Sequence, residues 1–128
     1  MPQEARVTLP AAARAKFTSL DEFWPFYLSQ HLNKATRRLH FAGTTLGLML
    51  SALAIFRHEA RLVAAALAAA YGCAWVGHFF FERNAPATFK HPLLSFRADF
   101  RMYALMWRGA LEEEIGRQVA AIRAYREF

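Results

Sequence analysis

The strongest pattern along the chain is a pair of long apolar runs separated by a short charged stretch. Residues 39–56 contain one histidine and no lysine, arginine, aspartate or glutamate, and residues 62–81 are equally free of these charged side chains. A helix needs about 20 mostly apolar residues to cross the hydrocarbon core of a bilayer. The second run has that length and the first is slightly shorter, so the pattern predicts two membrane spans.

The connection between the two runs predicts how they pair. Only residues 57–61 separate them, and so short a link requires neighbouring antiparallel helices. Small residues in both runs would let the two backbones approach closely. These residues are Gly43, Gly47, Ala65, Ala69 and Gly72. Because the first run is short, a buried hairpin in a water-soluble all-α protein is the alternative interpretation.

The segment before the hairpin, residues 17–38, predicts an interfacial helical region. Ser19 and Glu22 have the spacing of a capping box, and Pro25 should bend the helix or restart it a turn later. The aromatic residues of this region fit either a belt at the level of the lipid headgroups or a packed core. They are Phe23, Trp24, Phe26 and Tyr27, and the same choice applies to Tyr103 and Trp107 further along.

The segments after the hairpin predict a histidine-containing loop with an amphipathic helix, residues 82–109, and a C-terminal amphipathic helix, residues 110–128. In the latter, acidic residues come first and basic residues last, which suits the helix dipole. Its apolar stripe consists of Leu111, Ile115, Val119 and Ile122. We therefore expect one all-α membrane domain, residues 1–128, in which a transmembrane hairpin is flanked by interfacial amphipathic helices.

The distribution of basic residues predicts how the hairpin is oriented in the membrane. The sequence has 16 lysines and arginines and a formal net charge of +6, yet the hairpin tip carries only Arg57 and Arg61. Because basic residues collect on the cytoplasmic side of a membrane, both termini should be cytoplasmic. The basic flanks suit contact with anionic lipid, whereas no recognition motif supports nucleic-acid binding. The single cysteine, Cys73, excludes an intramolecular disulfide, and the first residues have no apolar core typical of a signal peptide.

The histidines are distributed unevenly over the predicted hairpin. His40 opens the first span, His78 lies near the end of the second, and His31 and His91 lie just outside the spans on the same side. His58 alone is at the tip. A single histidine at the end of a span is usually a hydrogen-bonded or snorkelling residue. Four on one side predict a transition-metal site, since neutral imidazole is the commonest protein ligand for such metals.

The spacing of these residues refines the prediction. His31 and His40 are nine residues apart, half a turn out of phase on one straight helix, so sharing a metal requires a break between them. Asn33 is a good N-cap and would supply that break, after which Asn33, Arg37 and His40 fall on one helical face. His91 directly precedes a proline, which predicts a loop that folds back over the site.

Glu82 lies four residues after His78 and shares its helical face. A glutamate at the C-terminal end of a helix opposes the helix dipole, so a partner must favour its charge there. Three roles remain open for it: a metal ligand, an acceptor for an imidazole N–H, or an ion-pair partner. The candidate ion-pair partners are Arg37, Arg38 and Arg83.

Two sequence blocks carry a resemblance to a known family. The block HLNKATRRLHFAG, which begins at His31, and the block GHFFFERNAPATFKHP, which begins at Gly77, resemble the Mpo1-like family of membrane 2-hydroxy fatty acid dioxygenases. The resemblance covers residues 26–109 and looks like a bacterial branch, which implies a multi-pass protein of the bacterial inner membrane. It implies an Fe(II)-dependent enzyme of fatty-acid α-oxidation that uses O2 to remove C1 from long-chain 2-hydroxy fatty acids. The implied metal ligands are His31, His40, His78 and His91, and the other candidate site residues are Glu82, Arg37 and Asn33.

The chemistry of such a substrate suits a site at the end of a hairpin. A 2-hydroxy carboxylate can chelate Fe(II) through its carboxylate and hydroxyl oxygens, while its acyl tail lies among apolar side chains. Arg37, Arg38 or Lys90 would neutralise the carboxylate. A non-catalytic membrane protein that binds haem or a structural metal, and a lipid-interaction protein with no metal, are the alternatives. A second copy of the chain is kept as a candidate partner.

Overall fold

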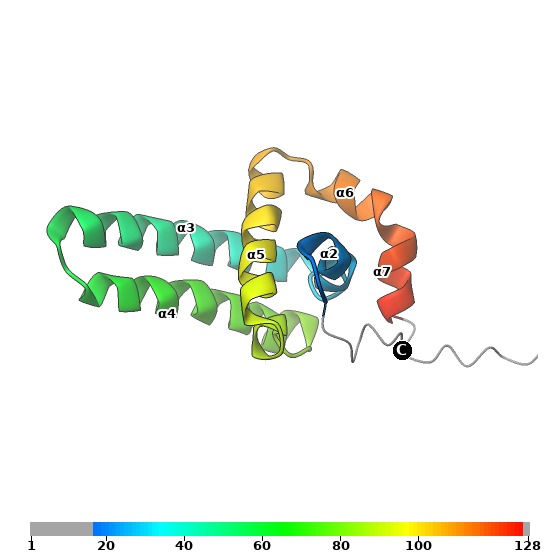
Figure 1. Ribbon diagram of the computed structural model, residues 1–128, viewed down its shortest axis with the longest axis horizontal. Helices are drawn as coiled ribbons and strands as arrows, with labels where there is room; N and C mark the ends of the chain where they lie inside the picture. Colours follow the sequence, from blue (N-terminus) through cyan, green and yellow to red (C-terminus); the bar gives the residue numbers. More distant parts are fainter. Residues whose placement is uncertain (1–16, 127–128) are drawn as a thin grey trace, which may run out of the picture.

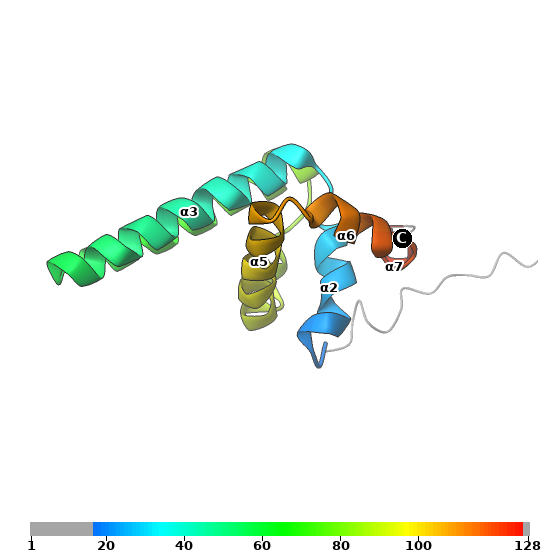
Figure 2. The same cartoon turned by 90° about the horizontal axis from the view of Figure 1, so that it is seen from above.

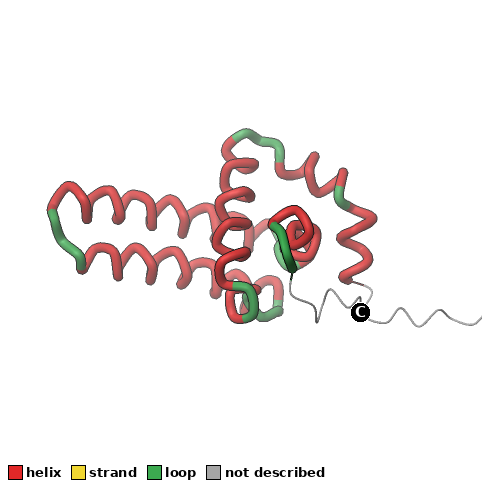
Figure 3. Tube along the Cα trace, viewed as in Figure 1, coloured by secondary structure: helices red, strands yellow, loops and turns green. Residues whose placement is uncertain are grey.

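The computed structural model describes residues 17–126, and every regular element in that part of the chain is helical (Figure 3). The elements are α2 (Leu20–Ser29), α3 (Lys34–Arg57), α4 (Arg61–Val76), the π-helical η1 (Gly77–Glu82), the 3₁₀-helical η2 (Ala87–Phe89), α5 (Pro92–Trp107), α6 (Leu111–Arg117) and α7 (Val119–Arg126). The all-α prediction is therefore confirmed.

Helices α3 and α4 form the predicted antiparallel hairpin, which projects as a long arm from the remaining helices (Figure 1). The tip is tight: His58 adopts the left-handed conformation, with φ of 53°, and the N–H of Glu59 donates to the carbonyl of Ala54 at 3.0 Å. This is how an α-helix commonly ends, because the left-handed residue lets the chain turn back onto the last carbonyls.

Two glycines set the close approach of the hairpin helices. A Cβ added to Gly43 would lie 2.8 Å from the Cβ of Cys73, and one added to Gly47 would lie 3.3 Å from the carbonyl oxygen of Ala66. Gly72 was expected at the same contact, but a Cβ added there would meet nothing within 4 Å. The small-residue seam therefore depends on α3 glycines and α4 alanines.

Both arms of the hairpin are long and apolar enough to cross a membrane. Residues 34–57 and 61–82 pass this test by length and composition, and only 22% and 17% of their most apolar windows are buried. A core helix of a soluble protein would be mostly buried. Large apolar side chains such as Met49, Ile55 and Phe56 are instead exposed, and this exposure favours lipid as the surroundings of the hairpin.

The base of the molecule is a small bundle in which α2 lies between α5 and the C-terminal helices (Figures 1 and 2). Phe23, Trp24 and Tyr27 of α2 are almost completely buried, and they pack against Ala98 and Met102 of α5. Of the two interpretations of these aromatic residues, the structure therefore supports core packing. Trp107 differs from them, since it is 66% exposed.

The ends of α2 and the start of α3 follow local capping rules. The Ser19 hydroxyl accepts from the N–H of Glu22 at 3.1 Å, as predicted, but the Glu22 carboxylate binds Thr18, so the capping box is incomplete. Helix α2 continues through Pro25 without the expected restart. The Asn33 side chain accepts from the N–H of Ala35 at 2.8 Å, which confirms it as the N-cap.

The C-terminal segment forms two helices where one was expected. Helix α6 ends at Arg117, and α7 begins at Val119 after a break at Gln118. The break lets the chain bend around α2, which seats Ile122 in the core and leaves Val119 44% exposed (Figure 1). The predicted apolar stripe therefore holds at its ends and fails at Val119, because a bend changes which face points inward.

The Gly43 contact can be tested with a matched pair of variants. Gly43→Ala should destabilise the protein by about 1–3 kcal/mol, because the added methyl forces α3 and α4 apart. Gly72→Ala should be neutral or stabilising by up to about 1 kcal/mol, since the site is open and alanine favours helix. Thermal unfolding in detergent, followed by circular dichroism, measures both. Equal midpoints for the two variants would contradict the close seam.

Candidate metal centre

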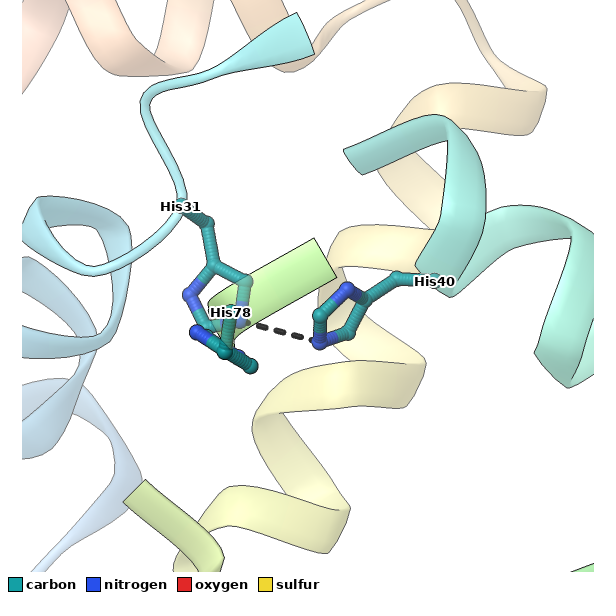
Figure 4. Close-up of side chains that lie close together, drawn as sticks. All are labelled: His31, His40 and His78. Atoms are coloured by element: carbon teal, nitrogen blue, oxygen red, sulfur yellow. Dashed lines mark hydrogen bonds between the residues drawn. The ribbon is translucent and has the colours of Figure 1, made fainter. Parts of the chain in front are cut away.

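Three buried imidazoles from three separate segments meet at the base of the hairpin (Figure 4). His31 lies in the loop after α2, His40 on α3 and His78 on η1. One ring nitrogen of each lies within 4.8 Å of the others. Their ring planes are nearly perpendicular to one another, at 81° to 85°, and the ring centroids lie 4.5 to 5.0 Å apart. We call this group the histidine triad.

The outer nitrogen of each ring is fixed by an oxygen acceptor. His31 Nδ1 lies 2.6 Å from the carbonyl oxygen of Tyr27, and His40 Nδ1 lies 2.8 Å from that of Thr36. A carbonyl oxygen can only accept, so both Nδ1 atoms carry the proton. The Nε2 atoms of these two rings are therefore the unprotonated ones.

His78 also carries its proton on Nδ1, and here the acceptor is a side chain, that of Asn84. Its Nδ1 lies 2.7 Å from Oδ1 of Asn84, and the Asn84 amide group donates to the carbonyl of Gln30 at 3.1 Å. This second bond fixes which end of the amide faces the imidazole, so His78 Nδ1 is also the donor. All three rings thus present an Nε2 lone pair on the side away from their hydrogen bonds.

The Nε2 atoms of His31 and His40 face each other at a short distance with no proton between them. His31 Nε2 and His40 Nε2 lie 3.1 Å apart, a hydrogen-bonding distance (dashed line in Figure 4), but with both Nδ1 atoms protonated neither neutral ring has a proton to donate there, and two lone pairs at that distance repel. Burial lowers the pKa of His31 well below its ordinary value, and the nearby His40 and His78 act in the same direction. A shared proton is therefore disfavoured near neutral pH, and the triad suits a cation.

The 3.1 Å separation of His31 Nε2 and His40 Nε2 also suits a metal ion. Two imidazole nitrogens bound at about 2.1 Å and at right angles would be about 3.0 Å apart. Neutral imidazoles are ligands for iron, zinc, copper and nickel, and a metal binds most readily where the ligands are already deprotonated. Within residues 17–126 the group consists of three histidines, so the protein would leave coordination positions open.

The triad depends on a close contact between α3 and η1. The Thr36 hydroxyl donates to the Gly77 carbonyl at 3.3 Å, and a Cβ added to Gly77 would lie 3.0 Å from Thr36 Cγ2. Thr36 supplies the carbonyl that holds His40, and Gly77 precedes His78. The absence of a side chain at Gly77 therefore lets His40 and His78 approach.

The π-helical turn places His78 and its partner. Asn84 is six positions after His78, a spacing that an α-helix would not bring to one face. Here the wider η1 turn ends at Arg83, in the left-handed conformation with φ of 59°, and the Asn84 N–H donates to the His78 carbonyl at 3.0 Å. Single π-helical turns are often found at functional sites for this reason.

The other residues predicted for the site lie beside the triad in supporting positions. Arg37 donates to the carbonyls of His31 and Leu32 at 3.3 and 3.2 Å, and to the Glu112 carboxylate at 2.6 Å. The Arg37 guanidinium group therefore links the loop that contains His31 to α6. Asn33 caps α3, and its N–H donates to the Glu82 carboxylate. Within residues 17–126, the side-chain contact of Glu82 is therefore to the backbone at the start of α3, beside the triad.

His91 is the one predicted ligand that the structure does not bring to the triad. It directly precedes Pro92 at the start of α5, and its ring packs against aromatic side chains beneath α2. The ring centroids lie 5.2 Å from Phe17 and 5.5 Å from Phe23. The expected loop over the site is instead the capping turn of α5, because proline at the first position of a helix favours its start.

Tyr27 and Asp99 were not predicted as site residues. The Tyr27 ring stacks on His31, with centroids 3.9 Å apart, and its hydroxyl donates to Asp99 at 2.5 Å. The nearby Arg101 forms its ion pair with Asp21, at 2.9 Å. Burial raises the pKa of Asp99 to about 7, so this carboxyl titrates near neutral pH.

Asn84 offers a test of how the triad is held. Asn84→Ala removes the acceptor of His78 Nδ1 and should weaken Co²⁺ binding about 10- to 100-fold, the usual cost of losing such a partner. Asn84→Asp keeps an acceptor oxygen and should bind Co²⁺ more tightly than Asn84→Ala. Titration followed by the visible Co²⁺ spectrum measures both. Wild-type affinity in Asn84→Ala would show that His78 needs no orienting partner.

Comparison with known proteins agrees with this geometry. A family model described as 2-hydroxy-palmitic acid dioxygenase Mpo1-like matches residues 17–111. No curated protein and no solved structure gives a significant match. The matched range contains the hairpin, the π-helical turn, all three triad histidines and Asn84. Because the match spans most of the chain, the protein belongs to the Mpo1-like family.

Proposed function

We propose that this protein is an Fe(II)-dependent dioxygenase of fatty-acid α-oxidation, which removes C1 from long-chain 2-hydroxy fatty acids. The observation that carries the proposal is the histidine triad, in which one ring nitrogen of each buried imidazole lies within 4.8 Å of the others at the base of an apolar hairpin. The family description supplies the reaction class. The choice of iron over other metals rests on that class, since the donor set alone also suits zinc or copper.

A catalytic metal is favoured over a structural one by the number of ligands. Structural sites are usually closed by four protein ligands, whereas catalytic sites keep a position open for substrate. The triad supplies three. Bound Fe(II) would supply the redox chemistry that activates O2 toward the substrate. The protein's own part is to hold three neutral Nε2 donors in place and to keep the site partly shielded from water.

The proposed reaction balances without a further reductant. One 2-hydroxy acid, R–CH(OH)–COOH, and one O2 give R–COOH, CO2 and H2O. The bond between C1 and C2 breaks, C2 becomes the new carboxyl carbon, and O2 accepts all four electrons. The unhydroxylated acid should be a poor substrate, because it lacks the hydroxyl oxygen that would fix this bond beside the site.

The basic residues that flank the hairpin support a cellular location and a membrane orientation for the protein. We propose a multi-pass protein of the bacterial inner membrane, with the triad end of the hairpin and both chain termini on the cytoplasmic side. The supporting observation is the charge distribution, since the tip carries two of the 16 lysines and arginines. A substrate that enters from the lipid would then meet the metal at the level of the headgroups.

The ligand set and the reaction are tested together. Replacing His31, His40 or His78 by alanine should remove most bound iron and abolish the shortened product, because two imidazoles hold iron poorly. His58→Ala, at the hairpin tip, should match wild type in both. Iron is quantified after anaerobic loading, and the acids are identified by mass spectrometry. Three triad variants with full iron content would exclude the triad as the metal site.

The reaction itself has a separate outcome. Wild-type protein with verified iron should consume O2 and convert a long-chain 2-hydroxy acid into the acid one carbon shorter, with no Soret band. If iron-loaded protein gives no shortened acid at any chain length, the dioxygenase assignment fails. A Soret band with stoichiometric haem would favour the haem-binding alternative.

His91→Ala separates the sequence prediction from the structure. Because the His91 ring packs among phenylalanines away from the triad, the variant should keep its iron and lose stability instead. The expected readouts are wild-type iron content and a lower thermal midpoint. Loss of iron at an unchanged midpoint would restore His91 as a ligand.

The proposed orientation is tested by labelling single cysteines. In a Cys73→Ser background, Glu59→Cys at the tip should react with an impermeant maleimide added to intact cells. Ala110→Cys, beyond α5, should react only after the cells are opened. The reverse labelling pattern would place the triad on the outer side of the membrane.

A further inference from the structure

An apolar cavity of about 210 Å³ runs beside the triad, between the hairpin and α5. Its wall includes the triad residue His40 and the half-buried carboxyl of Asp99. The rest of the wall is mostly small or apolar and includes Thr44, Gly47, Leu48, Ser51, Ala66, Leu67 and Ala70. The cavity is therefore continuous with the metal centre and is not an isolated void.

The lining residues define a groove along the seam of the hairpin. On α3 they recur every three or four residues from His40 to Ser51, which places them on one helical face. These eleven steps correspond to about 16 Å along the helix axis. One leaflet of a bilayer is about 15 Å deep, so the groove is about as long as one extended lipid chain.

The groove is wide where side chains are small and ends where the helices close. Gly47, Ala66 and Ala70 leave room between α3 and α4. Beyond Ser51, Ala54 on the same face of α3 is buried, so the seam is filled towards the tip. The groove therefore has a polar end at the triad and closes towards the hairpin tip. A fatty acid, with a carboxyl group at one end of a single apolar chain, matches this arrangement.

We propose that this groove seats the acyl chain of the substrate, with the carboxyl end at the triad and the terminal methyl near Ser51, and thereby sets the preferred chain length. The inference rests on the proposed function and extends it to specificity. A chain that enters from lipid is already in an apolar phase, so moving it into the groove gains little hydrophobic free energy. Selection by length must then come from steric fit.

Asp99 and Tyr27 complete the polar end of the groove. Tyr27 stacks on His31 and donates to Asp99, so this tyrosine links the Asp99 carboxyl in the cavity wall to the triad. A substrate head at the triad end of the groove would therefore lie near polar groups. The head is thus positioned by polar groups and the tail by steric limits.

The first experiment changes the length of the groove. Thr44→Leu fills it one turn from His40 and should lower the kcat/KM ratio of long to medium chains at least tenfold. Ser51→Leu fills only the far end and should move the optimum to slightly shorter chains. Ala52→Leu adds the same side chain at the same depth on an exposed face outside the groove, and should keep the wild-type profile. Iron content and thermal midpoint confirm that each variant is folded.

The second experiment needs no turnover. Metal-free protein in detergent is irradiated with a 2-hydroxy fatty acid that carries a diazirine on its last carbon, and the labelled peptides are identified by mass spectrometry. Labelling at Leu48, Ser51 or Leu67 that is prevented by excess unlabelled 2-hydroxy acid would support binding of the acyl chain in the groove. A phosphatidylcholine with the same diazirine tests whether ordinary lipid occupies it instead.

The outcomes separate this inference from the proposed function. If wild type is active but Thr44→Leu and Ala52→Leu share one chain-length profile, the acyl seat is wrong and the enzyme assignment stands. Labels spread over exposed residues such as Ile55 and Phe56, or displaced only by phospholipid, would also overturn it. If wild type is inactive on every acid while the labels at Ser51 are displaced by free acid, the seat stands and the dioxygenase assignment fails.

Discussion

The organisation of this protein depends on three hydrogen bonds that fix the proton on Nδ1 of each triad imidazole. Two of the acceptors are backbone carbonyls one helical turn before the histidine, at Tyr27 and Thr36, so the ring orientation follows from helix geometry. The third acceptor is the amide of Asn84. Because every outer nitrogen is occupied, every inner nitrogen is left as a lone pair in a buried space. That arrangement is unfavourable by itself and becomes favourable with a cation.

The hairpin and the location of the triad could be predicted from the sequence because both follow from local rules. Apolar length predicts the spans, a five-residue link requires an antiparallel pair, and a hairpin returns His40 and His78 to the same side. Asn33 as an N-cap correctly predicted the break that lets His31 turn toward them. The family resemblance was likewise confirmed.

The remaining details depend on backbone geometry that residue spacing does not encode. The relation of His78 to Asn84 requires a π-helical turn followed by a left-handed residue, and a regular helix would have placed Glu82 beside the imidazole instead. His91 followed the ordinary rule for a proline at a helix start, but sequence gave no means to see the phenylalanines that surround it. The break at Gln118 is similar, since only the position of α2 explains it.

The three ligands come from parts of the chain that fold in different surroundings. His40 and His78 belong to the apolar hairpin, whereas His31 is carried by the loop that α2 and its packed core hold in place. A hairpin inserted in the membrane before the base has folded would offer two imidazoles, and the third arrives only when α2 docks. Tight binding of a metal ion by all three imidazoles would therefore require the hairpin and the base to be assembled. A bound ion would then link the apolar hairpin to the helical base, and its occupancy would report that the two are correctly packed.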